Sequence, residues 1–148
     1  MNAESKVRLR LWLRLLRATR AIEVRVRERL RVEHGATLPR FDVLATLARA
    51  EEGLILSELS ERLMVSNGNL TGIVDRLEAD GLIDRRRRNG DRRTSFVSLS
   101  EEGQAVFERM AAEHERWIDE LLADVEAEEA ERLSTRLDGL LAQVEAHS

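Results

Sequence analysis

The 148-residue sequence contains no cysteine, one proline, eight glycines and only 3% aromatic residues. The absence of cysteine excludes disulfides, thiol switches and cysteine-ligated metal sites. So little proline and glycine, beside 35% charged residues, favours long helices over β-structure. No apolar run approaches the length of a membrane span, and no hydrophobic signal segment follows the N-terminus. We therefore expect a cytoplasmic protein of about one domain that uses no cofactor.

Charge is distributed unevenly along the chain. Residues 1–40 carry a net charge of +7 and residues 100–148 carry −10, whereas the whole chain carries −4. Local patches, rather than the total charge, govern binding to a phosphate backbone. The acidic C-terminal third is therefore expected to lie away from any nucleic acid that the rest of the chain contacts.

Long amphipathic helices are predicted at both ends of the chain. Apolar residues recur at helical spacing over residues 5–32, and Pro39 suits the first turn of a second helix over 39–50. Ser100 is a good N-cap for a long helix with acidic residues in its first turn. A last helix is expected over 127–146.

Two short helices are predicted in the middle of the chain. Ser57 is expected to cap a helix over 58–64, and Ser66 is expected to cap a helix over 67–80 that ends at Gly81. Two short helices joined by a tight turn match a helix-turn-helix. The stretch before them, Gly53-Leu54-Ile55-Leu56, can form a short extended strand.

The apolar stripes of the long helices exceed what one small core can bury. The surplus predicts association with a second copy of the chain, and a C₂ dimer is the commonest closed arrangement. The residues expected on the dimer faces are the large apolar side chains of the terminal helices, namely Leu9, Leu13, Trp117, Leu121, Leu133, Leu137, Leu140 and Leu141.

The start of the 67–80 helix has the composition of a DNA-reading surface. A recognition helix presents its N-terminal residues to base edges, where asparagine pairs with adenine and threonine contacts the thymine methyl. The residues expected there are Asn67, Gly68, Asn69 and Thr71, followed by Gly72 and Arg76. The alternatives are that the asparagines are solvated or capping residues and that Arg76 pairs with Asp80. The hydroxyls of Ser57, Ser66 and Thr71 can bind phosphates, and the two serines can instead serve as helix caps.

An arginine-rich hairpin tip follows the helix-turn-helix. Asn89-Gly90 is a strong hairpin signal, and the nine residues around it carry a net charge of +5. Such a tip can enter a narrow minor groove, and the alternative is a solvated charged loop. The basic residues assigned to DNA contact here are Arg85, Arg86, Arg87, Arg88, Arg92 and Arg93.

The stretch from Leu38 to Gly103 resembles the MarR/SlyA family of winged-helix transcription regulators. The resemblance is carried by "VDRLEADGLIDRR", by "DRR" in the hairpin and by "SLSEEG" after it. It implies a mainly α fold with a small β-hairpin. A winged helix-turn-helix domain, residues 37–100, would be flanked by a dimerisation region formed by residues 1–36 and 101–148.

The resemblance also implies a function. A homodimer of this family binds a pseudo-palindromic double-stranded operator, usually to repress nearby genes. Asp91 and Arg93 match the Asp-x-Arg of the family's wing, whose arginine enters the minor groove, and Asp75 matches an aspartate that helps to fix the wing. Many members carry arginine where this chain has Asn67 or Gly72, so sequence preference cannot be copied from them.

An effector site is implied between the dimer layer and the winged domain. The stretch "SNGNLTG" is similar to members that sense aromatic acids or their CoA thioesters. Arginine can pair with a carboxylate, and aromatic rings can stack on an aryl group. The residues assigned to this pocket are Trp12, Leu16, His34, Arg40, Phe41 and Leu44, with plain core packing as the alternative for Trp12, Phe41 and Leu44 and a helix cap or surface group as the alternative for His34.

Other functional classes fit the sequence less well. It shows no Gly-rich phosphate loop, no nucleophile beside a base and no catalytic histidine pair, so an enzyme is not expected. The three histidines lie far apart without metal-ligand spacing, so no metal site is expected. The remaining alternative is a winged helix used for protein–protein contact without specific DNA binding.

Overall fold

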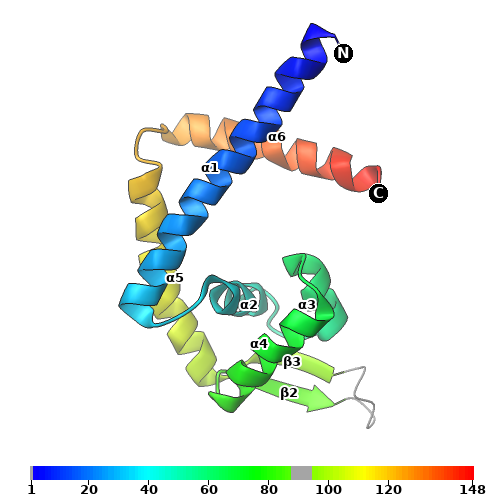
Figure 1. Cartoon of the computed structure of the whole chain (residues 1–148). Coiled ribbons are helices and arrows are strands. Elements are labelled where there is room, and N and C mark those ends of the chain that lie inside the picture. The colour runs from blue at the N-terminus through cyan, green and yellow to red at the C-terminus, as the bar shows by residue number, and fades with distance from the viewer. Residues whose placement is uncertain (1, 88–94) are drawn as a thin grey trace.

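The computed structural model describes residues 2–87 and 95–148. The longest helix is α1 (Ala3–His34). The C-terminal half of α1 packs beside α5 (Glu101–Leu121). Helix α6 (Ala127–Ala146) follows α5 and passes behind α1 in the view of Figure 1. The two terminal helices therefore extend from a compact middle, as the apolar pattern predicted.

The middle of the chain holds three shorter helices: α2 (Leu38–Ala48), α3 (Leu56–Leu63) and α4 (Asn67–Ala79). Helix α2 packs against α5, α3 and α4, so it links the long helices to the helix-turn-helix. Met64 ends α3 in the left-handed conformation, with φ of 56°, and this residue starts the tight turn into α4.

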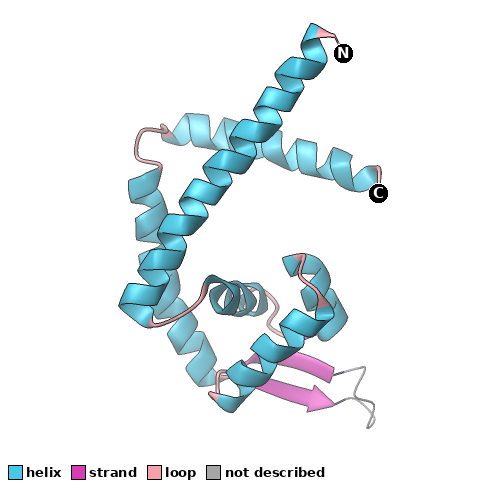
Figure 2. Cartoon of the chain, viewed as in Figure 1, coloured by secondary structure: helices cyan, strands magenta, loops and turns pink. Residues whose placement is uncertain are grey.

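A small antiparallel sheet completes this domain (Figure 2). Strand β3 (Ser95–Leu99) lies between β1 (Leu54–Ile55) and β2 (Ile83–Arg87). Ile83 faces Leu99 and Arg86 faces Phe96 across the hairpin. The predicted fold class, mainly α with a small hairpin, is confirmed, and β1 adds a third strand to that hairpin.

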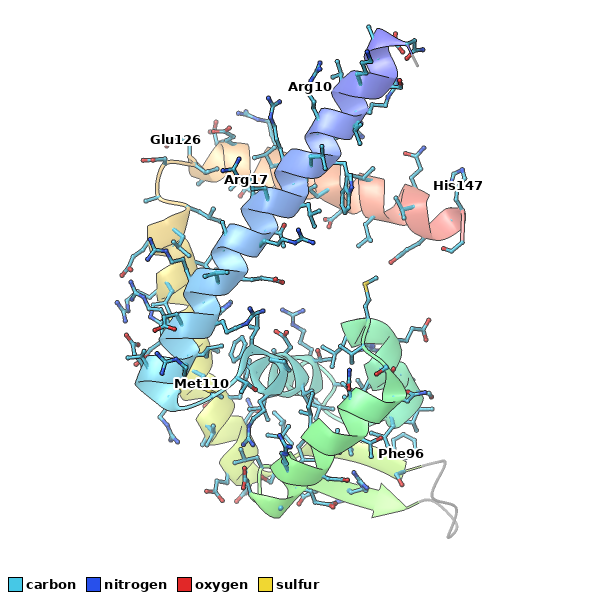
Figure 3. All side chains as sticks on the ribbon, viewed as in Figure 1. Arg10, Arg17, Phe96, Met110, Glu126 and His147 are labelled. Carbon is cyan, nitrogen blue, oxygen red and sulfur yellow. The ribbon has the colours of Figure 1, made fainter. Side chains whose placement is uncertain are left out.

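One apolar core connects all these parts. It includes Trp117 and Met110 of α5, Leu30 of α1 and Leu44 of α2. Met110 lies where α5 passes the C-terminal end of α1 (Figure 3). The other buried members come from every element of the middle domain and from α1, namely Val26, Phe41, Val43, Leu47, Leu54, Leu59, Leu70, Val74, Leu77, Leu82, Ile83 and Val97.

The predicted cap of α3 was wrong. The helix begins at Leu56, so the exposed Ser57 lies inside its first turn, and Ile55 occupies the cap position. The carboxylate of Glu58 accepts a hydrogen bond from the Ile55 backbone N–H at 3.3 Å. A carboxylate near a helix N-terminus satisfies an otherwise unpaired N–H, so the helix can start without a hydroxyl cap.

The start of α5 lies directly on the segment that follows α4. The Ser100 hydroxyl accepts from the Gly103 backbone N–H at 2.9 Å and donates to the Gly81 carbonyl at 2.6 Å. A Cβ atom at Gly103 would lie 1.9 Å from the Leu82 carbonyl oxygen. Glycine is therefore required at position 103 for α5 to approach the α4–β2 connection.

No helix within the described part of the chain is long and apolar enough to cross a membrane.

Candidate nucleic-acid interface

Helix α4 presents a polar outer face and buries an apolar inner one. Leu70, Val74 and Leu77 are buried at i, i+4 and i+7 against the domain core. The opposite side of the helix is exposed, and its residues are Asn67, Gly68, Asn69, Thr71 and Gly72 in the first two turns and Arg76 in the third. The sequence thus folds so that the inner leucines and valine fix the helix while the polar residues remain free for a partner.

Two glycines on this outer face are not required by the protein itself. A Cβ atom at Gly68 or at Gly72 would meet no atom within 4 Å. Glycine inside a helix costs about 1 kcal/mol relative to alanine, because it loses more backbone freedom on folding. Their presence leaves a shallow strip of bare backbone on the exposed side of α4, which is suited to close approach by another molecule.

Hydroxyl groups near the start of α4 are partly engaged by the helix. The Ser66 side chain accepts from the Asn69 backbone N–H at 3.4 Å, as expected for an N-cap. The Thr71 hydroxyl donates to the Asn67 carbonyl at 2.8 Å, and Thr71 is exposed. Ser57 is exposed in the first turn of α3.

Arg76 does not pair with Asp80. Among residues 2–87 and 95–148, Arg76 has no ion pair, and the Asp80 carboxylate instead accepts from Nη2 of Arg40 at 2.7 Å. Arg76 therefore keeps its charge available on the outer face of α4. The sequence could not distinguish these two partners, because Arg40 lies 40 residues away from Asp80.

Arg85 pairs with two carboxylates of α4. Its Nη2 lies 2.8 Å from Oδ1 of Asp75, and its Nε lies 3.7 Å from Oε2 of Glu78, both on α4. Its guanidinium joins the wing strand to α4, and the predicted contact of Arg85 with DNA stays a prediction. Arg86 points to the other face of β2 and is exposed.

Strand β2 ends at Arg87. The remaining predicted wing residues lie outside the described part of the chain, namely Arg88, Asp91, Arg92 and Arg93.

Three of the residues assigned to an effector pocket line one cavity. His34, Arg40 and Leu44 border a cavity of about 240 Å³ between the end of α1, α2 and α5. Sequence reasoning missed the other wall, which comes from later in the chain and comprises Leu82, Val106, Arg109 and Met110. Leu44, Leu82, Val106 and Met110 contribute apolar side chains to the lining, and Arg40, Arg109 and His34 contribute basic ones. These groups can hold a small anion with an apolar body.

The other three assigned pocket residues do not line this cavity. Phe41 is buried and stacks on Phe107, with ring centroids 5.9 Å apart. Trp12 lines a separate hollow of about 970 Å³ between α1 and α6. Leu16 is half-buried on α1 and lines neither cavity.

The apolar faces of α6 and of the first half of α1 are exposed in the single chain. No residue of α6 is buried, and Leu133, Leu137, Leu140 and Leu141 are between 39% and 56% exposed. Leu9, Leu13 and Leu121 are also exposed. Arg10 lies on the part of α1 that extends past α6 (Figure 3).

Trp117 corrects the predicted dimer face. This side chain is only 1% exposed in the single chain and packs in the core, with Arg29 of α1 over its ring at 5.9 Å. It therefore has no surface to contribute to an interface. The helical spacing in α5 identified an apolar stripe correctly but could not say which part α1 covers.

A polar cluster lies beside Trp117. His34 Nε2 is 2.8 Å from Oε2 of Glu113, and this hydrogen bond lowers the pKa of the Glu113 carboxyl below its ordinary value. Glu33 lies beside this pair. One side-chain atom of each of the three residues that could bind a metal ion lies within 4.8 Å of the other two. No spacing in the sequence indicated this cluster, because Glu113 is 79 residues from His34.

A helix-turn-helix with a β-wing, an exposed polar recognition face and an arginine-rich hairpin define a winged-helix DNA-binding protein. Residues 36–95 match the family model described as the MarR family. The chain belongs to the MarR family of transcriptional regulators, whose members are DNA-binding proteins and not enzymes.

A curated relative supports this assignment. The chain is 38% identical over 109 residues to the HTH-type transcriptional regulator PecS of Dickeya dadantii (strain 3937). That match covers 72% of this chain and 63% of the length of PecS. More than a third of the length of PecS therefore lies outside the matched region.

Two solved structures share the whole arrangement. A MarR family transcriptional regulator from Silicibacter pomeroyi superposes with a TM-score of 0.79 at 30% identity, over 97% of this chain and 99% of that chain. NadR in complex with 4-hydroxyphenylacetate superposes with a TM-score of 0.73 at 26% identity, over 86% of this chain and 89% of that chain.

Proposed function

We propose that this regulator acts as a homodimer that binds a pseudo-palindromic operator and represses the adjacent genes. In each subunit, residues 37–100 read the DNA, and residues 1–36 with 101–148 form the dimerisation region. The observation that carries the proposal is the exposed outer face of α4. There Asn67, Asn69 and Thr71 lie beside two glycines, although the protein has room for a side chain at both glycine positions. Such a face suits the major groove.

Dimerisation supplies the second half of the site. The leucines of α6 and the exposed apolar residues of the first half of α1 form a surface that a single chain leaves in water. Large exposed apolar patches mark interaction surfaces. A C₂ partner that covers both helices would place two α4 helices about one turn of DNA apart, which matches two half-sites.

The effector proposed for this dimer is a small aromatic carboxylate or its CoA thioester, held in the cavity bordered by Arg40 and Arg109. The aryl part would contact the apolar side chains of the lining, and the carboxylate would meet a guanidinium. The complex of NadR with 4-hydroxyphenylacetate supports this class of ligand.

Selection from a pool of random duplexes tests the DNA-binding proposal directly. The expected product is an inverted repeat whose half-site centres lie about 10 base pairs apart. Binding should weaken steeply between 50 and 200 mM salt, as expected for an interface with several phosphate contacts, roughly 6 to 10. Enrichment of no sequence, or of a single half-site bound by one subunit, would contradict the proposal.

A second measurement tests the effector. 4-Hydroxyphenylacetate, added to the complex with the selected duplex, should release the DNA and raise the melting temperature of the free protein. The same concentration of 4-hydroxyphenylethanol, which keeps the hydroxyphenyl ring and lacks the carboxylate, is the control. Equal effects of the two compounds would argue against recognition of a carboxylate.

A further inference from the structure

Arg40 belongs to two neighbouring features of the molecule. It borders the cavity between α1, α2 and α5, and its Nη2 donates to the Asp80 carboxylate at 2.7 Å. Asp80 is the residue that directly follows α4. A single side chain therefore connects the cavity to the C-terminal end of the recognition helix.

The connection between α4 and β2, residues 80–82, is held on its other side by α5. The Ser100 hydroxyl donates to the Gly81 carbonyl at 2.6 Å, and the Ser100 backbone N–H donates to the Leu82 carbonyl at 3.1 Å. Leu82 itself lines the cavity. The connection is thus clamped between α2 and α5, with the cavity directly against it.

A displacement of this connection would move α4 and the wing together. Arg85 of β2 is tied to Asp75 of α4 at 2.8 Å, so the strand and the helix share a second link besides the chain itself. Residues 80–82 are therefore the point where a change beside the cavity can reorient the whole DNA-reading unit.

The Arg40–Asp80 pair is suited to exchange. Its side chains are 27% and 53% exposed, and ion pairs with this exposure are weak. Arg109, which also borders the cavity, has no ion pair within the described residues. An anion in the cavity can therefore be held by Arg109 while it competes with Asp80 for the guanidinium of Arg40.

We propose that Arg40 positions α4 through Asp80 in the DNA-binding state, and that an anionic ligand in the cavity takes Arg40 away from Asp80 and so releases DNA. This inference rests on the proposed function and names the route by which the cavity controls the recognition helix. The ligand acts because it binds the state with the broken pair more tightly; equal affinity for both states would shift nothing.

The first test uses the full-length protein and the selected duplex without ligand. Asp80→Asn removes a negative charge, which by charge alone would strengthen DNA binding. The proposal predicts the opposite, a loss of about threefold in affinity. Asp84→Asn on β2 is the control, because Asp84 is exposed and has no ion pair within the described residues. Its affinity should be unchanged or higher. Asp80→Asn that binds as tightly as wild type overturns the proposal.

A charge exchange guards against a general loss of structure. Arg40→Asp alone should weaken DNA binding, whereas Arg40→Asp combined with Asp80→Arg restores a pair of opposite charges at the same place. The double variant should regain most of the lost affinity. No recovery, with both proteins melting cooperatively like wild type, overturns the positioning role of Arg40.

The second test uses 4-hydroxyphenylacetate as the probe and calorimetry as the measurement. Asp80→Asn should bind the probe about threefold more tightly than wild type, because Arg40 has lost its competitor. Arg109→Gln should bind the probe more weakly than wild type, because it removes the second guanidinium at the cavity. Unchanged probe affinity in Asp80→Asn overturns the competition. If wild type does not bind the probe, the proposed effector class fails, and the ligand-free measurements still decide the role of Arg40.

Discussion

The guanidinium of Arg85 on β2 lies 2.8 Å from the carboxylate of Asp75 on α4. The Arg85 side chain is only 20% exposed, and Glu78 supplies a second carboxylate at 3.7 Å. The base of the wing is therefore attached to the recognition helix before any ligand binds. Attachment of this kind reduces the conformational freedom that the wing would lose on binding.

Arg85→Gln should accordingly lower both stability and DNA affinity. It removes one partner of a partly buried ion pair and leaves Asp75 and Glu78 without a cation, which we expect to cost about 1 kcal/mol. Thermal melting and binding to the selected duplex measure the two effects. Arg86→Gln is the matched control on the exposed face of β2, and it should leave the melting temperature unchanged. Identical melting of the two variants would show that the Arg85 pair does not support the wing.

Gly72→Ala should change stability and DNA binding in opposite directions. The new methyl group meets no protein atom within 4 Å, so the gain in helix propensity should raise the free energy of unfolding by up to about 1 kcal/mol. The same methyl would stand where DNA approaches the backbone, so affinity should fall. Gly139→Ala on α6, where a Cβ is also unobstructed, is the control and should stabilise the protein without weakening DNA binding. Unchanged DNA affinity of Gly72→Ala would show that the duplex does not approach the α4 backbone at this position.

Leu137→Arg should prevent dimerisation. Leu137 is 46% exposed on α6, and a buried unpaired charge at the interface of two copies would be strongly unfavourable. Light scattering at micromolar concentration should report a monomer with much reduced operator affinity. Thr135→Arg, which adds the same charge on the opposite side of α6, should remain a dimer. A dimeric Leu137→Arg would mean that another surface joins the subunits.

Stability should fall as the pH drops below about 6.5, in part because of His114. Burial lowers the pKa of this imidazole below its ordinary value of 6.5, and its ring lies 4.8 Å from that of Phe41. The unfolded chain therefore binds a proton more readily than the folded one, so the folded state loses stability as pH decreases from 6.5 toward the lowered pKa. His114→Gln should show a smaller loss of melting temperature between pH 7 and 5.5. An equal loss in both proteins would assign the pH dependence to other groups.

Local signals predicted the boundaries of the helices well. Ser66 and Ser100 cap α4 and α5 as expected, because the capping hydroxyl and the N–H that it accepts from are three residues apart. Ser57 failed because Glu58 provides the oxygen that the N-terminus of α3 needs. Local sequence gives equal support to both starts, and the pairing of Ile55 with Phe96 in the sheet fixes the backbone just before Leu56.

Contacts between distant parts of the chain could not be predicted from the sequence. An apolar stripe indicates which face of a helix packs against another surface, but it does not identify that surface. Trp117 is buried by its own chain, whereas Leu137 stays exposed in the single chain. The arginines posed the same problem. Arg40, Arg76 and Arg85 all carry the same charge, and only the fold determines which of them find carboxylates.

The exposed apolar residues of α6 and of the first half of α1 make this regulator sensitive to its own abundance. On the proposed dimer, the operator-binding species forms from two copies, so at low copy number its amount rises with the square of the subunit concentration. A twofold change in expression would then change occupancy by more than twofold. Gene control by this protein would begin abruptly once enough chains have accumulated, before any effector is present.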